Sequence, residues 1–318
     1  MRFLFVDRIL DLVEGKSIRG IKNITLDEPF LTTQYTQIPS LYSAIVGETL
    51  GQLAAWNIMH NTGFKRRPVA GIFDSIKFYR PVFSGETMFL EANIDSCQEN
   101  AASYHGKAYV GDELVVSING ALAPMLPMEN FIDPSLVKIQ FAHIYRPGEL
   151  LPRETNYNLL GSVDISSLSS TSSSDVRFLD PADKPRDVGS ARVITNIDSC
   201  FQFDYLISCT DDQEIIASKL ISFSAPYFSD HFPNKPVLPL SVLLECVHNL
   251  SVFLLDKSQL TGFRLSEISK IKIRDFIQPG DYIICHLKLK SHDDNHVKLQ
   301  ATITLENRKI AIFVFAFN

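Results

Sequence analysis

Two residues that can exchange protons lie close together in the stretch 227–255. His231 sits in a turn rich in proline and aromatic residues, and Glu245 is the only charged residue between Leu240 and Leu255. An ionised carboxylate inside so apolar a helix is costly unless it is paired, so it indicates a site, although structural acids and histidines give the same pattern. Together, a histidine base and a carboxyl acid suit removal of a proton beside a thioester carbonyl while a hydroxyl leaves.

The pattern occurs a second time earlier in the chain. Glu48 lies 197 positions before Glu245 and is the only carboxylate in the apolar run 41–60. Other pairs repeat at the same spacing or at 195, namely Lys22 and Lys219, Pro29 and Pro226, Pro39 and Pro236, Ile76 and Ile271, Lys77 and Lys272, Gly85 and Gly280, and Glu86 and Asp281. Several matches at one nearly constant spacing indicate a duplication, so we predict two copies of one domain.

The elements that must position these residues follow from the hydrophobic patterns. Each copy is predicted to hold two strands, one long buried helix and three or more antiparallel strands, an α+β arrangement. The first helix is expected to begin near Ser40 or Ser43, either of which can cap it, and to stop at Gly63. The predicted bounds are 1–145 for copy one, 146–188 for a connection rich in serine and proline, and 189–318 for copy two.

Composition limits the class of protein. The 318 residues, 45% hydrophobic and 21% charged, are typical of about two globular domains. No apolar run reaches the roughly 20 residues of a membrane span, and residues 1–10 are too short and mixed for a signal peptide. The net charge of −6 argues against a general nucleic-acid surface. Five scattered cysteines without a CxxC pair are expected to be free thiols, as in the cytoplasm.

No pattern for a rival chemistry is present in the sequence. It contains no G-x-S-x-G elbow, Walker loop, G-x-G-x-x-G or H-E-x-x-H. The run from His292 to His296 could hold a metal, but its Asp-Asp-Asn centre is also typical of a turn between strands. We therefore expect neither a metal nor a cofactor.

Two further polar groups leave alternatives open. The basic run Lys65, Arg66 and Arg67 is either a solvated loop or a patch for an anionic group such as a phosphate or an acidic carrier protein. Gln52 and Asn249 each follow a helix acid by four positions and so share its face. They either hold the carboxylate by hydrogen bonds or are ordinary polar residues at a domain interface.

With these residues in view, the chain resembles the 3-hydroxyacyl-[acyl-carrier-protein] dehydratases of fatty acid synthesis in a tandem double-hotdog form. The motif F-x-x-H-F-P-x-x-P-V-x-P followed by a helix glutamate is carried by Phe228, His231, Phe232, Pro233, Pro236, Val237, Pro239 and Glu245. The resemblance covers most of both copies but not 126–188. It implies a double hotdog, with two antiparallel sheets each wrapped around a long central helix and the two helices side by side.

The resemblance also implies which residues do the chemistry. In the family the histidine and the acid of one site come from different domains, so the complete site is expected to be His231 with Glu48. The second site would pair Glu245 with Gln34, and it should be inactive because glutamine cannot act as a base. The implied reaction removes water from a 3-hydroxyacyl thioester to give a trans-2-enoyl product. Backbone N–H groups at a helix start would polarise the carbonyl.

Substrate contacts and partners are implied as well. The expected partner is an acyl carrier protein or a CoA thioester, with carrier docking on Lys65, Arg66 and Arg67. The expected substrate-binding residues are Leu240, Ser43, Gln52, Trp56 and Phe232, with Ile45 and Val242 as further candidate walls.

The sequence departs from the family at two places, which keeps rival functions open. Leu240 replaces a glycine and could crowd the thioester, and Tyr35-Thr36 replaces Phe-Pro in copy one. The rivals are a non-catalytic acyl-binding partner, which Leu240 favours, and a hotdog thioesterase.

Overall fold

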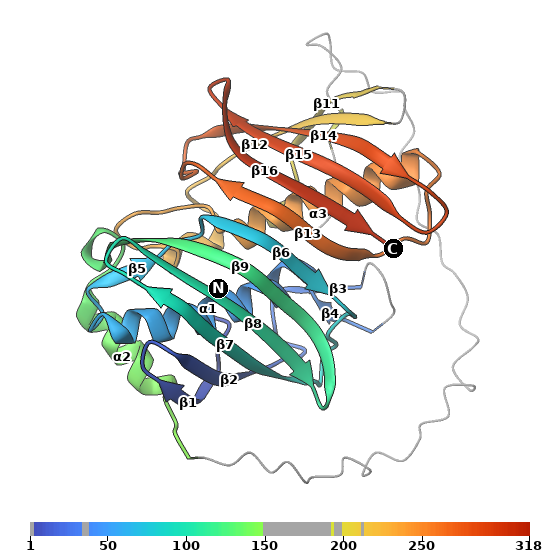
Figure 1. Ribbon diagram of the computed structural model, residues 1–318. Coiled ribbons are helices and arrows are strands. Elements are labelled where there is room, and N and C mark those ends of the chain that lie inside the picture. Colours follow the sequence, from blue (N-terminus) through green and yellow to red (C-terminus); the bar gives the residue numbers. More distant parts are fainter. Residues whose placement is uncertain (1–2, 34–37, 149–191, 194–198, 211–212) are drawn as a thin grey trace. The chain divides into compact units, whose positions relative to one another are not determined.

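The computed structural model describes residues 3–33, 38–148, 192–193, 199–210 and 213–318 (Figure 1). The first half of the chain contains, in order, β1 (Arg8–Val13), β2 (Ser17–Asn23), β3 (Leu31–Thr32), β4 (Ser40–Leu41), α1 (Ser43–Asn61), β5 (Arg66–Pro68), β6 (Ile72–Phe78), β7 (Thr87–Cys97), β8 (Ala101–Val110), β9 (Glu113–Pro127), the 3-10 turn η1 (Met128–Asn130) and α2 (Pro134–Ile144).

The described residues of the second half repeat this order with fewer elements. It contains β10 (Arg192–Val193), η3 (Ser199–Phe201), β11 (Tyr205–Thr210), β12 (Glu214–Leu220), η4 (Pro226–Ser229), α3 (Leu240–Lys257), β13 (Leu265–Ile273), β14 (Tyr282–His292), β15 (Val297–Leu305) and β16 (Arg308–Phe317). In both halves, strands precede one long helix and four longer strands follow it, as the sequence predicts. The predicted connection, 146–188, lies outside the described residues from position 149 onward.

Apart from β3 and β4, which pair with each other, the described strands of the two halves form one continuous antiparallel sheet rather than the two sheets that we expected. Its order in the described residues is β1-β2-β7-β8-β9-β6-β13-β16-β15-β14-β12-β11-β10, with β5 paired to β9. At the junction of β6 and β13, Ile76 lies opposite Ile268 and Phe73 lies opposite Ile271. The repeat spacing of 195 relates Ile76 to Ile271 and Phe73 to Ile268, so the two pairs are equivalent. The same relation holds at a two-fold interface between identical subunits.

Local geometry repeats together with the sequence. Gly85 and Gly280 both adopt a φ of 93°, a conformation that only glycine reaches without strain. The N–H of Gly85 donates to the carbonyl of Ile24 at 2.7 Å, and that of Gly280 donates to Ile221 at 2.8 Å. The same turn is therefore built twice, in agreement with a duplication.

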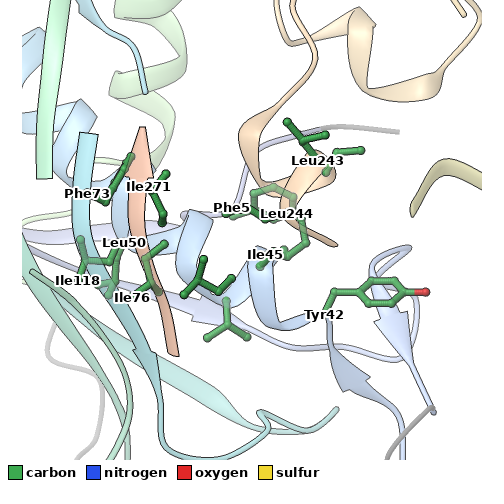
Figure 2. Close-up of a cluster of buried hydrophobic side chains, with 14 of the residues drawn as sticks. Phe5, Tyr42, Ile45, Leu50, Phe73, Ile76, Ile118, Leu243, Leu244 and Ile271 are labelled. Carbon is green, nitrogen blue, oxygen red and sulfur yellow. The ribbon is translucent and has the colours of Figure 1, made fainter. Parts of the chain in front are cut away.

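The long helices α1 and α3 contact each other, and each lies against the strands of its own half (Figure 1). Their apolar faces belong to one buried cluster that includes Phe5, Leu50, Ile76, Leu244 and Ile271 (Figure 2). Because this cluster draws on both halves, burial of apolar surface holds them together. In the part of the chain that the structure describes, no helix is long and apolar enough to cross a bilayer.

Helix α1 begins at Ser43, as the sequence predicts, but its cap differs from the prediction. Tyr42 is the N-cap residue and contributes no side-chain cap, so neither Ser40 nor Ser43 caps the helix. Instead, Oε2 of Glu245 accepts a hydrogen bond from the backbone N–H of Ala44 at 3.0 Å. A carboxylate is favourable there because the first N–H groups of a helix lack internal partners and carry partial positive charge.

The segment after β9, where we could assign no element from the sequence, contains η1 and α2. Pro134 is the first residue of α2, where its missing N–H costs nothing. Asp133 caps this helix by accepting the N–H of Ser135 at 2.8 Å. Pro134 therefore begins a helix instead of interrupting one.

Candidate active site

A cavity of about 180 Å³ lies between the two halves. Glu48 from α1 and His231 from the loop before α3 both line it, whereas Glu245 is not among its lining residues. His231 and the acid of the other copy thus line the same cavity. Gln34, the predicted counterpart of His231, lies outside the described residues.

The imidazole of His231 is fixed by its own loop. Its Nδ1 lies 2.8 Å from the carbonyl oxygen of Val237, which can only accept, so Nδ1 carries the proton and Nε2 keeps its lone pair. The backbone N–H of His231 donates to Tyr227 at 3.0 Å, and the N–H of Val237 donates to the carbonyl of His231 at 3.0 Å. Burial, with the positive charge of Arg67 adding to it, lowers the pKa of His231 to about 3. The ring is therefore neutral at neutral pH, as a base must be.

The carboxyl group of Glu48 has the opposite character. Burial raises its pKa, while a hydrogen bond from Gln52 and the charge of Arg67 partly offset this effect. Nε2 of Gln52 donates to Glu48 at 3.0 Å. Ser241 also favours the charged form of Glu48, although its buried hydroxyl forms no hydrogen bond of standard geometry. A raised pKa suits a carboxyl group that has to carry a proton.

Phe3 connects the two sides of this pair. Its N–H donates to Asp230, beside His231, at 2.9 Å, and its carbonyl accepts from Gln52, beside Glu48, at 3.2 Å. Its ring meets the imidazole of His231 edge-on, with centroids 5.5 Å apart. The N-terminal segment therefore fixes the imidazole relative to the acid.

Arg67 occupies a position that the sequence did not indicate. We predicted carrier docking on the surface, but Arg67 lines the cavity, and its guanidinium carbon lies 3.9 Å from the centre of the Phe232 ring. Its Nε is buried without a hydrogen-bond partner. Burial lowers the pKa of Arg67 to about 10, so it stays cationic at neutral pH.

The other two residues of the basic run remain outside the cavity. Arg66 forms an ion pair with Glu99 at 2.8 Å, and Lys65 is exposed.

Tyr104 is a cavity residue that the sequence analysis missed. Burial raises the pKa of its phenol, and the charge of Glu48 adds to this shift. Its inward register on β8 was the available signal.

The predicted substrate-binding residues divide into two groups. Leu240, Gln52, Trp56 and Phe232 line the cavity, but Ser43 does not. The further candidate walls are also wrong, since Ile45 and Val242 are fully buried in the core.

Glu245 and its neighbours have a structural arrangement. Besides the N–H of Ala44, its carboxylate contacts Nδ1 of His248 at 3.0 Å, and both side chains are buried. Asn249 donates to the carbonyl of Phe201 at 2.9 Å rather than to Glu245. Of the two amides that follow a helix acid, only Gln52 therefore holds one.

The remaining polar cluster forms a turn. Between β14 and β15, Oδ1 of Asp293 accepts the N–H groups of Asn295 and His296, each at 2.9 Å. The five cysteines are free.

The lowered pKa of His231 predicts how stability depends on pH. Below the ordinary value of 6.5, the unfolded chain binds a proton that the folded chain refuses until about pH 3. We therefore expect acidification from pH 6.5 to 4.5 to cost the wild type about 2 to 3 kcal/mol more than it costs His231→Gln. Glu48 acts in the opposite direction, since its raised pKa gives stability at acid pH that is lost as pH rises, but both proteins contain it.

Urea unfolding of the wild type and His231→Gln at the two pH values measures this difference. Equal losses of stability in the two proteins would show that His231 is not buried as a neutral ring.

Comparison with known proteins places the chain in a family. The model of the FabA-like domain matches residues 1–119, and that of the ApeI dehydratase matches residues 208–311. The 3-hydroxyacyl-[acyl-carrier-protein] dehydratase FabZ of Clostridioides difficile (strain 630) is 37% identical over 116 residues, which cover 36% of this chain and 80% of that protein.

Solved structures show the fold. A protein described as an oleoyl thioesterase from Lactobacillus plantarum aligns with a TM-score of 0.53 at 12% identity, covering 95% of this chain and 96% of that one. An acyl-ACP thioesterase from Bacteroides thetaiotaomicron VPI-5482 aligns with a TM-score of 0.50 at 10% identity, covering 95% and 98%. These likenesses establish a hotdog-like fold with an antiparallel sheet and few helices. From its sequence similarity, the chain belongs to the 3-hydroxyacyl-[acyl-carrier-protein] dehydratase family.

Proposed function

We propose that this protein removes water from a 3-hydroxyacyl thioester and releases a trans-2-enoyl thioester. The observation that carries the proposal is the shared cavity, in which a neutral imidazole with a free Nε2 and a carboxyl group of raised pKa come from opposite halves of the chain. Burial shifts the pKa of each group toward its neutral form, which favours His231 as a base and Glu48 as an acid. Membership of the dehydratase family supports this reaction.

The proposed step needs only these two side chains for proton transfer. Nε2 of His231 takes the proton from C2, and the electron pair left on C2 forms the double bond to C3. Glu48 gives its proton to the 3-hydroxyl, which leaves as water. The N–H groups in the first turn of α3, at Leu240 and Ser241, would stabilise the charge that develops on the thioester oxygen. Arg67 lies in the same cavity and would add positive charge there.

We further propose that the chain is a fused pair of hotdog domains, each built around one long helix, with the bounds 1–145 and 189–318 and a connection between them. One site, His231 with Glu48, would be active. Glu245, the equivalent acid in the second half, caps α1 of the first half and contacts His248. This arrangement fits a half-site that now has a structural role.

The substrate is proposed to arrive on an acyl carrier protein or as a CoA thioester. Acyl carrier protein is the carrier that appears in the name of the relative from Clostridioides difficile. Because Arg67 lies in the cavity, Lys65 and its neighbour Arg66 are the remaining candidates for contact with an acidic carrier.

The test is incubation of the protein with a 3-hydroxyacyl carrier thioester, followed by mass spectrometry of the products. We expect the enoyl thioester. Free acid would instead support a thioesterase. The solved thioesterase structures are similar to this chain in fold alone. No product, with the acyl thioester bound, would support a binding protein in which Leu240 blocks turnover.

A further inference from the structure

Residues 128–144, which form η1 and α2, lie beyond both family matches. The FabA-like match ends at residue 119, and the ApeI match begins at residue 208. Even so, Ile132 and Gln140 from this segment line the active-site cavity. We call residues 128–144 the extension.

The cavity follows one face of α1 away from the catalytic acid. Glu48, Gln52, Trp56 and Met59 all line it, and they recur every three or four residues, as one face of a helix requires. From Glu48 to Met59 this face rises by about 16 Å. An acyl chain whose C2 and C3 sit at the catalytic pair can therefore extend along α1 toward Met59.

The extension covers the later turns of α1. Phe141 of α2 packs on Trp56, with ring centroids 6.0 Å apart, on His60 at 5.1 Å and on Phe64 at 5.4 Å. Gln140 is the neighbour of Phe141 and faces the cavity. The extension thus forms the wall beside the part of the cavity that is remote from Glu48.

The position of this wall is tied to the catalytic loop. The backbone N–H of Asn234 donates to the carbonyl of Phe131 at 2.9 Å, and its side chain donates to the carbonyl of Glu129 at 3.3 Å. The ring of Phe131 packs edge-on against Phe232, with centroids 5.2 Å apart. The distance from the imidazole of His231 to the extension is therefore held by direct contacts.

We propose that the extension sets the longest acyl chain that the site accepts, with Ile132 and Gln140 as the residues that end the channel. The proposal rests on the proposed dehydration. Ile132, at 7% exposure, fills space that a longer chain would need. A longer alkyl chain would also cover the amide of Gln140 without offering it a hydrogen bond, which is unfavourable.

The experiment compares Ile132→Ala and Gln140→Ala with the wild type on a ladder of saturated 3-hydroxyacyl carrier thioesters, from butyryl to palmitoyl. We expect kcat/KM for the first chains beyond the wild-type limit to rise by about tenfold or more, because one methylene group in an apolar pocket changes discrimination by that much. The matched control is Ile139→Ala, beside Gln140 on α2 but 52% exposed, which should keep the wild-type profile. An unchanged profile in the cavity variants, or an equal change at every length, would overturn the proposal.

Two measurements separate this proposal from the proposed function. If the wild type dehydrates no member of the ladder, the proposed function fails, and the length limit is then read from calorimetric binding of saturated acyl-CoA thioesters of the same lengths. A longer limit in the cavity variants supports the extension as the determinant, and an unchanged limit overturns it. Circular dichroism checks folding, and Ile132→Val replaces Ile132→Ala if the latter does not fold.

Discussion

Replacing His231 with glutamine is expected to lower kcat/KM for dehydration by about 10²- to 10⁴-fold, the usual effect of losing a general base. Glutamine has similar bulk and can still donate to the carbonyl of Val237, which Nδ1 contacts at 2.8 Å, but it has no basic nitrogen. The fold should survive because the loop is also held through its backbone. The rate of enoyl product formation, with circular dichroism to verify folding, measures the effect.

His248→Gln is the matched control for this variant. His248 is buried at 1% exposure on α3 and contacts Glu245 rather than the cavity. Turnover should therefore stay close to that of the wild type. The assignment of the base is wrong if His231→Gln retains its turnover, or if the two variants lose it equally.

Local sequence signals pointed to the centre of the proposed site because they lie within single elements. The motif around His231 and the lone acids Glu48 and Glu245 could be read directly, and the repeat spacing placed the two helices in equivalent positions. The pairing of His231 with Glu48 rather than with Glu245 came from the family resemblance. Both residues line the shared cavity.

The features that sequence reasoning missed depend on contacts between distant segments. The charge of Arg67 suggested a solvated or docking residue, because nothing nearby in sequence shows that Phe232 covers its guanidinium group. The extension contains Pro134, and its packing against Trp56 through Phe141 has no local signature. The cap of α1 was likewise sought in nearby serines, although an acid some 200 positions away supplies it.

The second large prediction concerns the two helix acids, Glu48 and Glu245. They occupy equivalent positions in the two repeats but have different surroundings. Glu48 faces the cavity, and no cation of the described residues lies within ion-pair distance of it. Glu48→Gln should lower kcat/KM by about 10²- to 10⁴-fold, since an amide cannot give a proton to the leaving hydroxyl. The free energy of unfolding should not fall, because burial of this carboxyl group is unfavourable to its charge.

Glu245→Gln should have the reverse effect. Its carboxylate accepts the N–H of Ala44 at the positive end of α1 and contacts His248, so replacing it weakens charge-assisted hydrogen bonds at a fully buried position. We expect the free energy of unfolding to fall by about 1 to 3 kcal/mol while turnover is retained. Urea unfolding and the dehydration assay on both variants give the four values. Loss of turnover in Glu245→Gln with full activity in Glu48→Gln would show that the roles of the two acids are exchanged, and the catalytic imidazole would then have to be sought outside the His231 loop.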